Sequence, residues 1–121
     1  MLHLKVSGLR NDEATVWVAL YNAENKFLSF EDIFRAKKIK PLSGQYFVEM
    51  GFDDLPEGEY ALTAFQDENE NGKLDTNFWG IPVEKYGFYR AYRPIFSAPK
   101  FEDCAFYFDN TEDVQIEIIL K

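Results

Sequence analysis

The sequence has only one cysteine, Cys104, and one histidine, His3, and it contains no long apolar run. A single cysteine permits no internal disulfide. With one histidine in the chain, we assign no serine–histidine–aspartate or cysteine–histidine catalytic set. A membrane-spanning helix needs about 18 or more consecutive apolar residues, so we predict no membrane span. The sequence therefore indicates neither a disulfide framework, nor a nucleophilic triad, nor a transmembrane segment.

Basic residues are also scarce. Lys and Arg number 13 against 21 Asp and Glu, which gives a net charge of -8 and a pI near 4.6. Nucleic-acid-binding domains present a basic surface, so we predict no nucleic-acid partner. An excess of acidic residues instead favours the binding of cations. The 121 residues have the length of one domain with its own core, and we assign residues 1–121 to a single domain.

Alternation of apolar and polar residues predicts most of the chain to be β-strand. Strands are predicted at residues 2–7, 15–21, 45–52, 60–66, 104–108 and 114–120, with a lysine-rich edge strand at Lys37, Lys38 and Lys40. Residues 109–112 are predicted as a hairpin turn between the last two strands. About seven strands joined by mostly short turns predict an all-β fold, an antiparallel Greek-key sandwich.

Two side chains in these strands are predicted to lie in the interior. Tyr60 follows Pro56 and Gly58 at a strand start, where sandwich folds place a buried corner tyrosine. We expect its hydroxyl group to bond to the backbone of the preceding turn. Cys104 alternates with Phe106 and Phe108, which predicts a core thiol.

Residues 67–102 form the exception to this pattern. Their apolar residues follow no sustained strand or helix periodicity, and the segment contains Gly80, Pro82, Gly87, Pro94 and Pro99. Loops longer than about 12–15 residues are uncommon in compact domains unless they are functional or disordered. The segment is too rich in aromatic residues for a disordered one, so we predict one long, ordered loop.

The start of this loop has the spacing of a cation site. Asp67, Asn69, Asn71, Gly72 and Asp75 fit the first part of the calcium-loop pattern D-x-[DN]-x-[DN]-G. Ca²⁺ takes 6–8 oxygen ligands, and alternate residues of a tight loop direct their side chains to one point. The glycine permits the sharp turn. The backbone carbonyl of Lys73 is expected to complete this part of the shell.

The match to the calcium loop is incomplete. The twelfth position, which is a bidentate Glu in the helix-loop-helix version, is Phe78 here, and Glu84 is the candidate that replaces it. Two charged ligands, Asp67 and Asp75, predict modest affinity, about 10⁻⁴–10⁻³ M. An alternative is a surface turn without an ion, because Asn, Asp and Gly are ordinary turn residues.

Cationic and aromatic residues alternate further along the loop. The candidate ligand surface consists of Trp79, Tyr86, Phe88, Tyr89, Arg90, Tyr92 and Arg93. Aromatic faces and guanidinium groups both suit stacking on an anionic or sugar ligand, so a protein or glycan partner is possible. The alternative is that these aromatic side chains cover the open end of the sandwich, since aromatic-rich segments usually pack.

Three segments carry a family resemblance: Leu55–Ala61, which reads L-P-E-G-E-Y-A, then Asp67–Asn77, then Gly80–Phe88, which reads G-I-P-V-E-K-Y-G-F. Together they resemble the bacterial domain-of-unknown-function family 2141. The sequence departs from the family at Gln66, where a His is usual, and at Tyr89-Arg90, which replace small polar residues. Any role of that His is therefore absent.

The resemblance implies a prealbumin-like or immunoglobulin-like sandwich, similar in outline to the collagen-adhesin B-type repeats. It also implies an exported protein, periplasmic or secreted, although no signal peptide is visible after Met1. It implies no established activity.

Two functions follow from these observations. The first is a noncatalytic, calcium-stabilised β-sandwich module with a structural or ligand-binding role at the bacterial cell envelope. The alternative is a metal-dependent hydrolase or lyase that uses metal-bound water at the Asp67–Asp75 loop, with Glu84 as the base. A catalytic metal site keeps an open coordination position, whereas a structural site is closed by protein ligands.

Overall fold

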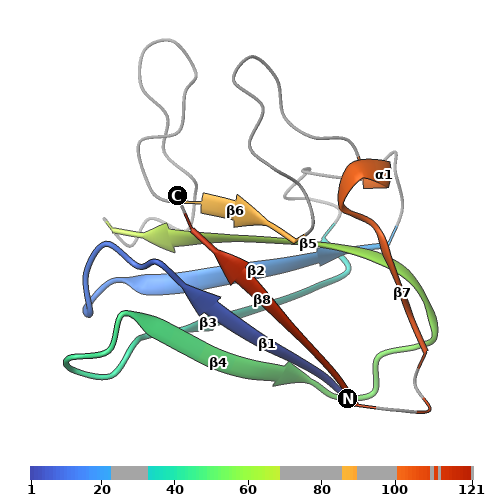
Figure 1. Cartoon of the computed structure of the whole chain (residues 1–121), viewed down its shortest axis with the longest axis horizontal. Coiled ribbons are helices and arrows are strands. Elements are labelled where there is room, and N and C mark those ends of the chain that lie inside the picture. The colour runs from blue at the N-terminus through green and yellow to red at the C-terminus, as the bar shows by residue number, and fades with distance from the viewer. Residues whose placement is uncertain (23–32, 69–85, 90–100, 110, 112, 121) are drawn as a thin grey trace, which may run out of the picture.

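The computed structural model describes residues 1–22, 33–68, 86–89, 101–109, 111 and 113–120. These residues form eight strands and one single-turn helix (Figure 1). In chain order the elements are β1 (Leu2–Ser7), β2 (Thr15–Tyr21), β3 (Arg35–Ile39), β4 (Phe47–Phe52), β5 (Gly58–Asp67), β6 (Tyr86–Phe88), α1 (Phe101–Cys104), β7 (Phe106–Phe108) and β8 (Val114–Ile119). The prediction of an all-β fold is confirmed.

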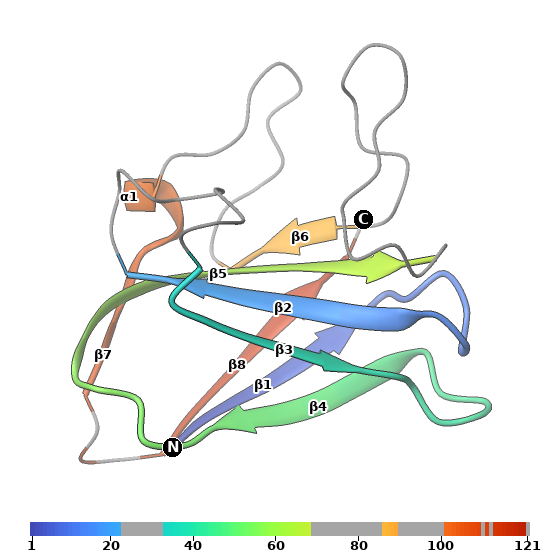
Figure 2. The same ribbon diagram turned by 180° about the vertical axis from the view of Figure 1, so that it is seen from behind.

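The strands form two sheets that pack face to face (Figures 1 and 2). One sheet has three strands in the order β4-β1-β8, and the other has five, in the order β3-β2-β5-β6 with β7 paired to the start of β5. All strand pairs are antiparallel except β1 and β8, which run parallel with Leu2 opposite Val114. The prediction of a wholly antiparallel sandwich is therefore wrong for this pair.

Two local predictions are also corrected near the C-terminus. Residues 104–108 were expected to be one strand, but α1 ends at Cys104 and β7 begins at Phe106. The expected hairpin at residues 109–112 is not one, because β7 pairs with β5 while β8 pairs with β1 in the other sheet. The turn thus connects the two sheets. Alternation along a strand does not reveal which neighbour the strand pairs with.

The predicted long loop is interrupted by a strand. Residues 86–88 form β6, with Phe65 opposite Tyr86 and Ala64 opposite Gly87. Gly87 faces β8, where a Cβ atom at this position would lie 2.9 Å from Cγ2 of Ile118. A residue without a side chain therefore lets β6 approach the other sheet closely. Residues 69–85 and 90–100 lie outside the described part of the chain.

The main core lies between the sheets. It is formed by the inward-facing residues of both sheets, including Leu2, Leu4 and Val6 of β1, Val16, Val18 and Leu20 of β2, Leu62 of β5, Phe108 of β7 and Ile116 and Ile118 of β8. A second apolar cluster lies on the outer face of the five-stranded sheet, where Tyr21 and Ala61 pack against Phe101 and Cys104 of α1. Cys104 is fully buried as predicted, but in this second cluster rather than with Phe106 and Phe108 in the main core.

Tyr60 occupies the predicted corner position. Its side chain is 3% exposed, and its hydroxyl group donates a hydrogen bond to the carbonyl oxygen of Pro56 at 2.5 Å. Burial raises the pKa of Tyr60, and the charge of Arg35 partly opposes this shift. The predicted hydrogen bond to the preceding turn is confirmed.

The lysine-rich segment forms an edge strand as predicted. β3 is the terminal strand of its sheet, and its lysines are exposed. Lys37 donates a hydrogen bond to the carbonyl oxygen of Gly51, and the Arg35 guanidinium group donates to the carbonyl oxygens of Asp53 and Asp54 at 3.0 and 3.2 Å. These cations connect the edges of the two sheets, and charged edge residues also oppose pairing with another chain.

Candidate metal centre

The predicted cation loop begins at the last residue of β5. Asp67 is 1% exposed, and it pairs with Thr15 of β2. It lies near the end of a strand that is apolar on both faces. Among the described residues, no buried side-chain nitrogen or oxygen atom lacks a hydrogen-bond partner. The backbone of Asp67 is fixed in place, because it is part of a regular ladder.

The residue before Asp67 anchors the end of β5. Gln66 is fully buried, and its amide group contacts the turn between β1 and β2. The Gln66 side-chain oxygen accepts a hydrogen bond from the backbone N–H of Arg10 at 2.8 Å. Its amide nitrogen donates to the carbonyl oxygens of Asn11 and Ala14, at 3.0 and 3.2 Å. The side chain therefore bonds to three backbone groups of this turn at the end of the core.

The turn that Gln66 contacts is also stabilised by side-chain hydrogen bonds within the turn and to Gly44. The Asn11 side-chain oxygen accepts hydrogen bonds from the backbone N–H groups of Glu13 and Ala14, at 3.0 and 2.8 Å. Asp12 accepts a hydrogen bond from Gly44 N–H at 2.7 Å. Asn side chains commonly stabilise turns in this way. These hydrogen bonds fix the turn that Gln66 contacts at the end of β5.

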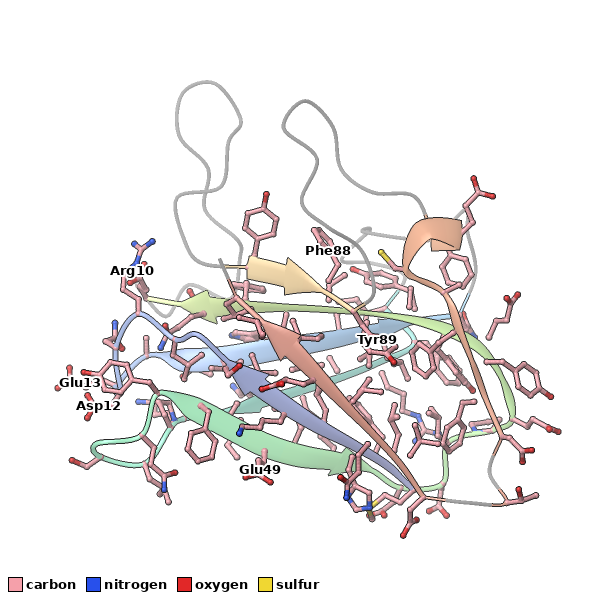
Figure 3. The ribbon with its side chains drawn as sticks, in the orientation of Figure 1. Arg10, Asp12, Glu13, Glu49, Phe88 and Tyr89 are labelled. Carbon is pink, nitrogen blue, oxygen red and sulfur yellow. The ribbon has the colours of Figure 1, made fainter. Side chains whose placement is uncertain are left out.

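The residue after Asp67 is held to the same turn. Arg10 Nη1 lies 3.1 Å from Glu68 Oε2, and the two side chains are 51% and 24% exposed. Figure 3 shows Arg10 beside the end of β5. An ion pair at this exposure contributes about 1 kcal/mol or less to stability. Its position matters more, since Gln66 and Glu68 hold the backbone on both sides of Asp67.

Asp67 is the predicted metal ligand whose surroundings the structure describes. Asn69, Asn71, Lys73, Asp75 and Glu84 lie outside the described residues. Within the described ranges, no group of three or more His, Cys, Asp or Glu side chains is arranged to hold a metal ion.

The described part of the predicted ligand surface lies on both faces of the five-stranded sheet. Tyr86 and Phe88 share the outer face, with their ring centroids 5.6 Å apart in an edge-to-face arrangement. Tyr89 turns to the inner face and packs against Phe106 at 5.2 Å. Figure 3 shows Phe88 and Tyr89 on opposite sides of the sheet. Trp79, Arg90, Tyr92 and Arg93 lie outside the described residues.

A family model described as "Uncharacterized protein conserved in bacteria (DUF2141)" matches residues 4–117. The chain belongs to this family. The match runs from within β1 to within β8 and so includes both sheets and the Asp67 loop. No curated protein and no solved structure matches the chain. Membership in DUF2141 confirms the resemblance that the three sequence motifs indicated.

Sequence reasoning missed an aromatic row on the outer face of this DUF2141 chain. Trp17 of β2 lies opposite Phe65 of β5, and Phe65 lies opposite Tyr86 of β6. The Lys38 ammonium group lies 5.3 Å from the Trp17 ring centroid at the end of this row. The one sequence signal is that β2 and β5 are apolar at successive positions. The row itself could not be predicted, because the register between two strands cannot be read from either strand alone.

The anchor residues were also missed. The sequence marks Gln66 only as a departure from the family, and it indicates no role for Arg10 or Asn11. Their partners lie 52 to 58 residues away in the chain. No spacing rule connects residues at that separation.

In the described part of the chain, no helix is long and apolar enough to cross a bilayer.

Proposed function

We propose that this protein is a noncatalytic calcium-binding β-sandwich module with a structural or ligand-binding role at the bacterial cell envelope. The observation that carries the proposal is the position of Asp67. Asp67 is 1% exposed and lies at the end of β5, a strand that is buried on both faces. It also begins the run Asp-x-Asn-x-Asn-Gly. Carboxylate and amide oxygens are the ligands that Ca²⁺ prefers.

The fit between the residues and the ion rests on charge and geometry. The Asp67 carboxylate brings formal charge, and Ca²⁺ takes carboxylate oxygens as ligands. Gln66 and Glu68 hold the backbone on both sides of Asp67. Ion binding would therefore need to order this ligand only slightly. Asn69, Asn71, the Lys73 carbonyl, Asp75 and Glu84 are the further ligands in the proposal.

The finer fold assignment belongs to the same proposal. We assign a prealbumin-like Greek-key sandwich rather than an immunoglobulin-like one. In an immunoglobulin constant domain the first two strands lie in one sheet, whereas β1 and β2 lie in different sheets here. The place in the cell envelope rests on the family's bacterial distribution and on the export that the family resemblance implies. Fractionation of the native host should recover the protein outside the cytoplasm, and recovery in the cytoplasm would contradict the location.

The ligand-binding role is supported by the outer face of the five-stranded sheet. Tyr86, Phe88 and Trp17 are each partly exposed on this face. The partly exposed rings of Trp17 and Tyr86 lie on β2 and β6, on either side of the buried Phe65 of β5, and aromatic faces suit stacking on the rings of a glycan. A glycan array tests this role, with the Trp17→Ala variant as the comparison. Equal binding by both proteins would remove the aromatic row from the proposal.

Calorimetric titration with CaCl₂ and MgCl₂ tests the calcium site directly. We expect Ca²⁺ binding at about 10⁻⁴–10⁻³ M, and a free energy of unfolding higher by about 2.7 kcal/mol at 100 times Kd, which raises Tm by several degrees. Asp67→Asn should abolish both effects while preserving side-chain volume. Glu49→Gln is the matched control, because it removes one exposed carboxylate from β4 in the other sheet (Figure 3). Identical melting curves in Ca²⁺ and EDTA, with no binding heat, would contradict the proposal.

A further inference from the structure

The connection between β3 and β4, residues 40–46, presents apolar side chains to solvent. Leu42 is 68% exposed and Tyr46 is 54% exposed. Figure 2 shows this connection projecting at one end of the molecule. The backbone N–H of Gln45 donates a hydrogen bond to the Leu42 carbonyl oxygen at 2.9 Å, and Gly44 N–H donates to Asp12 at 2.7 Å. The connection is therefore a closed turn that holds its apolar side chains at the surface.

The same part of the chain is basic, although the protein as a whole is acidic. Residues 33–46 contain Arg35, Lys37, Lys38 and Lys40 and no Asp or Glu, whereas the net charge of the chain is -8. All three lysines are exposed. Opposition to edge pairing accounts for lysines on a terminal strand, but it does not account for exposed apolar side chains directly after them. A partner that matches both features is anionic and has an apolar layer.

We propose that residues 38–46 dock on the surface of an anionic lipid bilayer, with Lys38 and Lys40 at the headgroups and Leu42 inserted below them. Anionic headgroups attract Lys and Arg side chains that lie near the surface. Apolar side chains next to such cations enter the boundary between headgroups and acyl chains, and Tyr is enriched at this boundary. This inference goes beyond the proposed calcium site and does not depend on it.

The distribution of acidic residues permits this orientation. Asp53 and Asp113 lie at the far end of β4 and β1 from the connection, since Phe52 and Val114 both pair with Leu2. At about 3.4 Å per residue, the length of β4 separates these carboxylates from the connection by about 20 Å. The Debye length at physiological salt is about 8 Å. Their repulsion from the lipid is therefore largely screened when the connection faces the bilayer.

Vesicle flotation with the full chain tests the proposal. We expect the protein to float with vesicles of equal parts phosphatidylglycerol and phosphatidylcholine and not with phosphatidylcholine alone. Binding should weaken as salt is added, because exposed charges are screened. Absence of binding to the anionic vesicles would overturn the proposal. Equally tight binding to soluble poly-glutamate would also overturn it, because an acidic polymer or protein would then suffice as the partner.

Two charge variants test where the lipid binds. Lys40→Gln should weaken binding about fivefold, the equivalent of about 1 kcal/mol for one Lys near an anionic surface. Lys5→Gln is the matched control, because it removes the same charge from a residue that lies between Glu49 and Glu117 in its row across the three-stranded sheet. This control should weaken binding far less. Equal losses would show that net charge alone governs binding, which would overturn the docking surface.

The neighbouring turn provides a variant with the opposite sign. Figure 3 shows Asp12 and Glu13 at the same end of the molecule as the connection, and Glu13 is exposed. Its carboxylate opposes the approach of an anionic surface, so Glu13→Gln should tighten binding. Weaker binding by this variant would contradict docking through this end.

Apolar variants separate insertion from attraction to headgroups alone. Leu42→Ser should weaken binding about tenfold, because burial of a Leu side chain is favourable. Tyr46→Ser should weaken it less, and Tyr107→Ser is its matched control, since Tyr107 is a similarly exposed tyrosine that lies opposite Glu59 on β7. All of these side chains are exposed, so circular dichroism should show unchanged folding. Unchanged binding by Leu42→Ser, or equal losses for the two tyrosine variants, would overturn insertion of the connection.

Discussion

The outer faces of the two sheets differ in what they present. The three-stranded sheet directs mostly polar residues outward, among them Lys5, Glu49 and Glu117 in one row across β1, β4 and β8. The five-stranded sheet directs Tyr21, Ala61 and Phe65 outward, and these are almost fully buried. One sheet is apolar on one face, and the other is apolar on both faces at its central strands.

This difference indicates where a functional segment can be attached. A sheet that is buried on both faces is a rigid base, and binding residues usually lie on connections that such a base positions. The Asp67 loop leaves from β5, and β6, which carries Tyr86 and Phe88, joins the same sheet. Each candidate functional residue that the structure describes therefore belongs to, or directly follows, a strand of the five-stranded sheet.

The largest effect is expected from matched truncations on the two outer faces. Phe65 is 8% exposed on β5, and Ile119 is 56% exposed on β8. Phe65→Ala should lower the free energy of unfolding by about 3–5 kcal/mol, because it leaves a cavity in a packed region. Ile119→Ala should change it by only about 0.5 kcal/mol. Urea unfolding measures both values, and equal losses would show that the two outer faces do not differ.

A smaller effect is expected at the start of β5. Tyr60→Phe should cost about 1 kcal/mol, since the Pro56 carbonyl oxygen loses its hydrogen-bond donor. Tyr107→Phe on the adjacent strand is the control, because Tyr107 is 63% exposed. Urea unfolding at neutral pH compares the two variants, and an unchanged stability of Tyr60→Phe would contradict the corner assignment.

The same tyrosine predicts a pH dependence. The pKa of Tyr60 is raised above 10.0 by burial, so the folded state holds the phenolic proton more tightly than the unfolded state. The corresponding stability is fully present below pH 10.0 and is lost as the pH rises through the higher, folded-state pKa. The unaltered protein should therefore lose stability more steeply above that pH than Tyr60→Phe, as measured by urea unfolding across the alkaline range.

The smallest effect is expected at the edge where the sheets are connected. The ammonium groups of Lys37 and Lys38 each lie 5.3 Å from an aromatic ring centroid, Phe52 for Lys37 and Trp17 for Lys38. Lys37 also donates a hydrogen bond to Gly51 of the other sheet. Lys37→Met should therefore cost about 0.5–1 kcal/mol more than Lys38→Met. Thermal unfolding in parallel samples measures the difference, and equal Tm values would indicate that the connection between the edges adds no stability.

Much of the fold could be predicted from the sequence because most strands either alternate or are continuously apolar. The apolar set Leu2, Leu4 and Val6 is the inward face of β1, and the corner Tyr60 follows its Pro-x-Gly turn. The parallel pairing of β1 with β8 could not be predicted, since pairing depends on the route of the whole chain. The three-residue strand β6 was missed because it is too short to show a period.

The candidate site was predictable only in part, for a related reason. Asp67 was identified by local spacing, and the structure shows that it is buried at the end of β5, while its role as a ligand stays a prediction. Gln66 and Arg10 are brought together only by the antiparallel pairing of β2 with β5, so no local motif contains both. A sequence shows which side chains are candidate ligands, whereas the contacts that position them depend on tertiary structure.

The most direct test of the central claim is a calcium titration followed by amide ¹H–¹⁵N NMR spectra. An ion bound at the end of β5 should give progressive, saturable shifts at the amides of Gln66, Asp67 and Glu68 and at the anchoring turn, residues 10–14. The amides of Lys5 and Glu117, on the polar outer face of the three-stranded sheet, should not shift. Absence of any shift at Asp67, or shifts of equal size on both sheets, would contradict an ion site carried by the end of β5.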